Sequence, residues 1–162
     1  MKPGQSKKII LWATVLVLVV VIIIGTAIVV ERHKSNNVTM TTAQINNAKQ
    51  QIEQSWKTFF AYSTSPKQRE DLLQNGNQFT QPIQTEFSSL GSAASSAEVK
   101  SINIINPTSA NVIYTVKLNG QPVLSDQKGV AVLINNSWKV SDSTLCQLLG
   151  LAGTKPTVCQ NI

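Results

Sequence analysis

The chain has 162 residues and a formal charge of +6, and only 14% of its residues are charged. Its positive charge is scattered: three lysines precede residue 9, and the remainder carries eleven basic against eight acidic residues. A nucleic-acid-binding protein typically gathers its positive charge on one face or helix. We therefore expect no nucleic-acid partner, and the length favours one globular domain of ordinary size.

The first feature in chain order is an uncharged apolar run of 22 residues, Ile9 to Val30, which follows a short basic tail at residues 1–8. At about 1.5 Å per residue, a helix of this length spans a bilayer core of about 30 Å. The alternative is a secretion signal that is cleaved after Ala27, where small residues precede the bond. The apolar run continues past that point, so we predict an uncleaved single-pass membrane anchor.

The orientation of this anchor follows from charge and from cysteine usage. The basic tail at residues 1–8 outweighs Glu31, Arg32 and Lys34 on the other side, which favours a cytoplasmic N-terminus. The chain has two cysteines, both near the C-terminus, and an even number is typical of a disulfide in an oxidising compartment. We therefore expect a protein of the cell membrane whose C-terminal domain is extracytoplasmic.

The domain is predicted to open with a long amphipathic helix. Residues 31–40 are polar and read as a linker, and Thr41 and Gln44 then have the spacing of a capping box, in which each side chain satisfies a backbone donor of the other. An apolar stripe with three- and four-residue steps follows, made up of Ile45, Ala48, Ile52, Trp56 and Phe59. We expect a domain at residues 41–162 whose first helix ends near Tyr62.

Two shorter helices are predicted next. Ser65 and Gln68 form a second capping box, with proline at the first helical position. We expect this helix to end in a left-handed turn at Asn75-Gly76, because glycine is the usual residue at such a terminator. A third, weaker helix is expected from Pro82 to Leu90, and the small and polar residues 91–96 are typical of a loop.

The apolar period then changes from about 3.6 to 2, which is typical of β-strands. Strands are expected at Val99 to Ile105, Val112 to Leu118, Gly129 to Ile134 and Trp138 to Val140. In the third of these, Val130, Val132 and Ile134 alternate. Asn119-Gly120 and Asn135-Asn136 are strong signals for tight hairpin turns, and Asn106 to Ser109 forms a further turn.

These elements predict an α+β fold in which about three helices precede an antiparallel sheet of about four strands. The long helix is expected to cover one face of the sheet, since an uncovered sheet of this apolarity would aggregate. The order of a long helix, two shorter helices and a curved meander resembles the cone-shaped nuclear-transport-factor-2-like fold.

The two cysteines are expected to form a disulfide. Cys146 lies on a short helix that Ser141 or Ser143 can cap, and Cys159 follows a bend. A zinc site needs four ligands and a catalytic cysteine needs a nearby base, but the only histidine, His33, lies beside the predicted anchor. We therefore predict a Cys146–Cys159 bridge, and no metal or cofactor.

No acid–base pair can be assembled in the domain from its sequence. The domain has no histidine, and its acids fall at helix surfaces, turns or caps. We therefore name no catalytic residues and expect a protein that is not an enzyme. The residues that could line a pocket, or else form the core, are aromatic: Trp56, Phe59, Phe60, Tyr62, Tyr114 and Trp138. We favour the core interpretation.

The C-terminal part of the chain resembles the signature of the mycobacterial low-molecular-weight antigen family. The residues that carry the resemblance are Gly129 to Leu133, Trp138 to Ser141, Thr144 to Cys146, Leu148-Leu149, Leu151 to Gly153, Pro156 and Cys159. Weaker matches upstream extend the resemblance to about Trp56. It implies an envelope-exposed domain with a nuclear-transport-factor-2-like fold and no catalytic residues to carry over. The departure is the predicted anchor, where the family has a secretion signal or a lipid attachment.

Three functions follow from these observations. The first is a non-enzymatic envelope protein that binds a partner protein or a small, lipid-like apolar ligand outside the membrane. The second is an accessory subunit of an envelope lipid-import or conjugation and secretion complex. Such subunits share the same plan of a short cytoplasmic tail, one membrane helix and a cone-shaped domain outside, which is an analogy at the level of fold. The third is an isomerase- or dehydratase-like enzyme, in which Tyr114 and Asp126 would be the residues to test.

Overall fold

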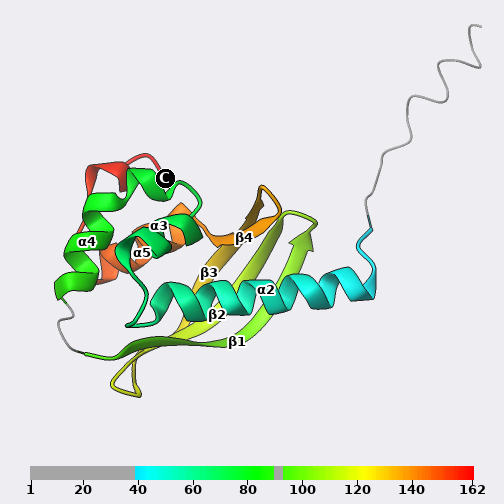
Figure 1. Cartoon of the computed structure of the whole chain (residues 1–162), viewed down its shortest axis with the longest axis horizontal. Coiled ribbons are helices and arrows are strands. Elements are labelled where there is room, and N and C mark those ends of the chain that lie inside the picture. The colour runs from blue at the N-terminus through cyan, green and yellow to red at the C-terminus, as the bar shows by residue number, and fades with distance from the viewer. Residues whose placement is uncertain (1–38, 90–92) are drawn as a thin grey trace, which may run out of the picture. The chain divides into compact units, whose positions relative to one another are not determined.

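Four α-helices and a four-stranded antiparallel sheet make up the part of the chain that the computed structural model describes, residues 39–89 and 93–162 (Figure 1). The helices are α2 (Thr42–Phe60), α3 (Pro66–Leu72), α4 (Thr80–Ser89) and α5 (Asp142–Leu151). The strands are β1 (Ser95–Asn106), β2 (Ser109–Leu118), β3 (Gln121–Ile134) and β4 (Ser137–Val140). Two short 3-10 helices are η2 (Gly76–Gln78) and η3 (Thr157–Cys159). The expected α+β class is confirmed.

The anchor expected at Ile9 to Val30, the tail before it and most of the linker lie outside the described residues. Across residues 39–89 and 93–162, none of the helices is both long enough and apolar enough to span a bilayer.

Helix α2 begins where its capping box predicts. The Thr41 Oγ1 accepts from the Gln44 N–H at 3.2 Å, and the Gln44 Oε1 accepts from the Thr41 N–H at 2.8 Å. The apolar stripe is buried from Ala48 to Phe59, with Ile52 fully inaccessible, whereas Ile45 at its start is partly exposed. Figure 1 shows α2 lying across one face of the sheet, and the Ser55 hydroxyl ties it to the sheet by donating to the Trp138 carbonyl at 2.7 Å.

The sheet is a simple meander in the order β1-β2-β3-β4. Both predicted hairpin turns are confirmed: Asn119 and Gly120 have φ of 51° and 77°, and Asn135 and Asn136 have φ of 50° and 60°. Two successive residues with positive φ give the turn twist that matches the right-handed twist of the flanking strands. Each strand therefore pairs with its neighbour in the sequence.

The face of β3 that packs under α2 carries small residues. Ala131 lies opposite Ala110, and Gly129 lies opposite Val112. A Cβ on Gly129 would lie 3.2 Å from the Trp56 ring, so the large rings above this strand need small residues beneath them. The apolar alternation of Val130, Val132 and Ile134 marks the opposite face of β3, which is half-exposed.

The expected left-handed terminator at Asn75-Gly76 is wrong. Helix α3 ends at Leu72, and Leu73 is extended and forms a parallel bridge to Val140 of β4. Asn75 has φ of −123°, and Gly76 begins η2 without a positive φ. Gly76 is needed for a different reason: a Cβ there would lie 1.9 Å from the Glu70 carbonyl oxygen.

Replacing Gly76 by alanine therefore forces two backbone segments apart. We expect Gly76→Ala to lower the free energy of unfolding by about 2–3 kcal/mol through overpacking. The control is Gly150→Ala in α5, where a Cβ meets nothing within 4 Å. Because alanine is the better helix former, this control gains about 0.5–1 kcal/mol. Urea unfolding of the full-length protein, followed by tryptophan fluorescence, measures both effects. Equal effects of the two substitutions would contradict the close approach of Gly76 to Glu70.

Candidate apolar binding site

Five of the six aromatic residues singled out in the sequence lie in the hydrophobic core. Their exposed fractions are 4% or less: Trp56, Phe59, Phe60, Tyr114 and Trp138. The Trp56 and Tyr114 rings meet edge to face with centroids 6.1 Å apart, and Phe59 and Phe60 meet similarly at 5.2 Å. The space between α2 and the sheet is thus filled by the protein's own side chains.

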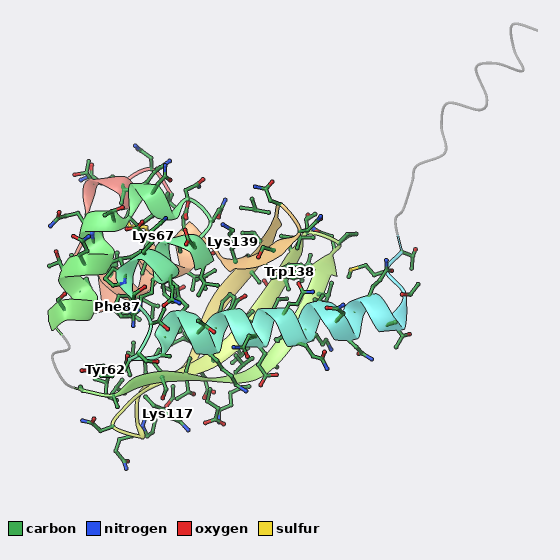
Figure 2. All side chains as sticks on the ribbon, in the orientation of Figure 1. Tyr62, Lys67, Phe87, Lys117, Trp138 and Lys139 are labelled. Carbon is green, nitrogen blue, oxygen red and sulfur yellow. A yellow bond between two sulfur atoms is a disulfide. The ribbon has the colours of Figure 1, made fainter. Side chains whose placement is uncertain are left out.

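Tyr62 differs from the other five, because its side chain is 54% exposed. Helix α2 ends at Phe60, two residues before the expected end, and Tyr62 lies in the turn that follows. Its N–H donates to the Ser95 carbonyl at 2.9 Å, which fixes the backbone beside the start of β1 and leaves the ring outside (Figure 2). Tyr62 therefore belongs neither to the core nor to a pocket lining.

A buried arginine explains why α2 ends where it does. Arg69 of α3 is only 4% exposed, and its guanidinium donates to the Phe59 carbonyl at 2.9 Å and the Ala61 carbonyl at 2.6 Å. It also donates to the Thr64 carbonyl. No carboxylate within the described residues pairs with it, and burial lowers the pKa of Arg69. The sequence pattern did not indicate that Arg69 is buried, because an arginine on a short polar helix is usually exposed.

The other side of this guanidinium lies against an aromatic ring. The Arg69 Cζ is 3.9 Å from the centroid of the Phe87 ring, a cation–π contact. Phe87 also meets Phe59 edge to face at 5.7 Å. Figure 2 shows Phe87 on the side of α4 that faces the other helices. Arg69 thereby fixes the position of α4 and of the wall that Phe87 forms.

That wall borders an open cavity of about 330 Å³ at the end of the sheet where α4 and α5 lie (Figure 1). We call it the α4–α5 cavity. Its lining includes Phe60 and Phe87 and, from α5, Leu145, Leu148 and Leu149. The sheet and the end of α5 contribute Val116, Leu118, Val123, Leu124 and Ala152. Of the six aromatic candidates, only Phe60 borders it, so sequence reasoning missed this site.

The polar groups of the cavity are few and mostly occupied. The Ser95 hydroxyl donates to the Phe60 carbonyl at 2.8 Å, and the Ser89 hydroxyl donates to the Glu86 carbonyl at 2.7 Å. The Glu86 Oε1 accepts from the Thr154 hydroxyl at 2.9 Å. Glu86 is the one ionisable residue among the lining residues. The arrangement suits the binding of an apolar molecule with one polar contact.

The Cys146–Cys159 disulfide is present, with the two Cα atoms 5.5 Å apart, and it joins α5 to η3. Ser141 caps α5, because its Oγ accepts from the Thr144 N–H at 3.2 Å; this settles the choice between Ser141 and Ser143. The chain between the cysteines contains Thr154, which contacts Glu86. The disulfide thus ties the C-terminal tail to α5, and the hydrogen bond from Thr154 to Glu86 joins that tail to α4 beside the α4–α5 cavity.

The residues of the enzymatic hypothesis do not border this cavity. Tyr114 is 1% exposed in the core, and burial raises the pKa of its hydroxyl. Asp126 is exposed at a position of φ 51° in β3. In the described ranges 39–89 and 93–162, no three His, Cys, Asp or Glu side chains gather in a way that could hold a metal ion.

The fold and the cavity define a small α+β domain that is cross-linked by one disulfide and has an apolar cavity at one end. The family model of the low molecular weight antigen MTB12, C-terminal domain, matches residues 45–156, about two thirds of the chain. The protein belongs to this family. The match begins at Ile45, so it also takes in the part of α2 before Trp56, which the resemblance seen in the sequence did not reach. No curated protein and no solved structure matches the chain.

Removing the Arg69 guanidinium should lower the stability of the domain. Arg69→Met keeps much of the apolar stem but removes the guanidinium donors from the carbonyls of Phe59, Ala61 and Thr64, of which the Ala61 carbonyl keeps the Thr64 N–H. We expect the free energy of unfolding to fall by about 3 kcal/mol. Lys67→Met, an exposed lysine on the same helix, is the control and should leave the urea midpoint within error, since exposed ion pairs contribute little. A loss of similar size in both variants would show that Arg69 has no special role.

The disulfide is expected to contribute about 3 kcal/mol, because the cysteines are 13 positions apart and their bridge closes a loop of moderate length. The double variant Cys146→Ser, Cys159→Ser should lower the midpoint of thermal unfolding of the full-length protein, as measured by circular dichroism. The wild type should show no alkylated thiol before reduction in mass spectrometry. Alkylation of both cysteines in the native protein would contradict the bridge.

Proposed function

We propose that this protein is a membrane-anchored, extracytoplasmic and non-enzymatic envelope protein, and that its folded domain binds a small apolar ligand in the α4–α5 cavity. The observation that carries the proposal is the cavity itself, at about 330 Å³ with an apolar lining. Ligand sites in proteins have volumes of about 300–1,000 Å³ and are lined mainly by hydrophobic side chains with a few polar groups. The α4–α5 cavity is at the small end of this range.

Apolar surface at the cavity supplies the driving force for binding. Val123, at the start of β3, lines the cavity and is 49% exposed, so an occupant would remove part of its side chain from water. Burial of apolar surface is worth about 25 cal/mol per Å². Because the core between α2 and the sheet is already filled, a ligand is expected at this end of the domain and not between helix and sheet.

The location belongs to the same proposal. The uncharged run Ile9 to Val30 supports a membrane anchor, and the Cys146–Cys159 bridge supports an oxidising compartment outside the membrane. The domain would then sit close to a lipid bilayer, which is a source of apolar ligands.

A nuclear-transport-factor-2-like architecture is part of the proposal as well. A long helix across a four-stranded antiparallel meander, with the three shorter helices α3, α4 and α5 at one end, supports it (Figure 1). In such a cone the α4–α5 cavity would form the open mouth, and the aromatic core between α2 and the sheet would form the closed interior.

The experiment is photolabelling of the full-length protein in nanodiscs with an alkyl diazirine, followed by peptide mapping. We expect labels on the peptides of α4 and α5. Leu148→Trp fills the cavity with a larger apolar ring and should reduce this labelling about tenfold, the equivalent of about 1.4 kcal/mol.

The matched control is Leu151→Trp on the same helix, where the side chain is 56% exposed and does not line the cavity. It should keep the wild-type labelling, and circular dichroism confirms that both variants are folded. Labelling that is unchanged by Leu148→Trp would refute the ligand site. A stable multi-subunit complex after mild detergent extraction, with no labelling, would favour the accessory-subunit function instead.

A further inference from the structure

Among the described residues that line the α4–α5 cavity, Glu86 is the only charged one, and one of its carboxylate oxygens is free for a ligand. Ser89 and Ser95 use their hydroxyls on backbone carbonyls. Glu86 has its Oε1 bound to the Thr154 hydroxyl, and its Oε2 has no hydrogen-bond partner among the described residues. An occupant of this apolar space therefore meets a single charged acceptor among the described lining residues, the carboxylate of Glu86.

The charge of this carboxylate is not neutralised by a cation of the domain. Glu86 takes part in no ion pair among residues 39–89 and 93–162. The guanidinium of Arg69 lies against Phe87 and has its donors turned to three backbone carbonyls. Lys117, between two lining residues of β2, is bound to Glu98. A negative charge without a partner thus stands at the edge of an apolar lining.

The position of this carboxylate is fixed from two elements. Glu86 belongs to α4, and Thr154 belongs to the tail that the Cys146–Cys159 bridge holds. The hydrogen bond between them leaves the side chain little rotational freedom, so a ligand would not have to order it on binding. A preorganised acceptor of this kind discriminates between head groups more sharply than a mobile surface glutamate does.

We infer that the α4–α5 cavity selects single-chain amphiphiles with a primary ammonium head group, and that the free carboxylate oxygen of Glu86 binds that head group. The inference rests on the proposed ligand-binding function. An ammonium supplies both a compensating charge and hydrogen-bond donors, and its alkyl chain lies along the leucines of α5. A carboxylate head group has no donor to offer and is repelled by Glu86, so fatty acids are selected against.

The test is competition with the alkyl diazirine in the full-length protein, reconstituted in phosphatidylcholine nanodiscs. Dodecylammonium should displace the label at about tenfold lower concentration than dodecanoate, with dodecanol between them. Glu86→Gln keeps an oxygen that accepts from Thr154 but loses the charge, and should abolish the preference for dodecylammonium. Glu86→Lys should reverse it in favour of dodecanoate.

The control is Glu53→Gln, an exposed glutamate of α2 that pairs with Lys57 and does not line the cavity. It should keep the wild-type preference, which excludes an effect of net charge on how the amphiphiles enter the nanodisc. If wild type and Glu86→Gln rank the three compounds alike, the head-group inference is overturned while ligand binding stands. If none of the compounds displaces the label and Leu148→Trp has no effect, the proposed function itself has failed.

Discussion

The buried guanidinium of Arg69 is the interaction on which the helical end of the domain depends. It satisfies carbonyls at the end of α2 and in the turn beyond it, where the chain reverses toward α3. A helix leaves its last carbonyls without intrahelical partners, and their burial without donors is costly. One side chain meets this need and also supports the Phe87 ring of α4. Termination of α2, placement of α4 and the wall of the α4–α5 cavity thus share one cause.

The sequence predicts those features whose signal is local. Capping boxes at Thr41 and Ser65 work over three residues, and both helices begin where the boxes place them. The turns at Asn119-Gly120 and Asn135-Asn136 need positive φ, which the residue types themselves favour. Because the chain has two cysteines, each has one possible partner within the chain. In each of these cases the residues that determine the feature lie within a short stretch of chain.

The features that the sequence could not predict depend on tertiary contacts between separate segments of the chain. Gly76 reads as a helix terminator, but its lack of a side chain serves contact with the Glu70 carbonyl. On β3 the more apolar residues lie on the half-exposed face, because the rings of Trp56 and Tyr114 fill the space above Gly129. The close fit takes precedence even over hydrogen bonding, since Trp56 Nε1 is the buried side-chain polar atom in the described chain that lacks a partner. The α4–α5 cavity likewise draws on helices and strands that are far apart in sequence.

The sequential order of the meander has a consequence for how the domain acquires its structure. Every strand pairs with the strand next to it along the chain, so each hairpin closes only a short loop. The disulfide also joins residues of one terminal segment. Such local contacts give a low entropic barrier, and folds that are rich in them form quickly. The contacts that need distant parts of the chain to meet are those of the helical segment, such as the Ser55 hydroxyl of α2 on the Trp138 carbonyl and the bridge between Leu73 and Val140. The sheet can therefore form before α2 docks on it, even though α2 comes first in the chain.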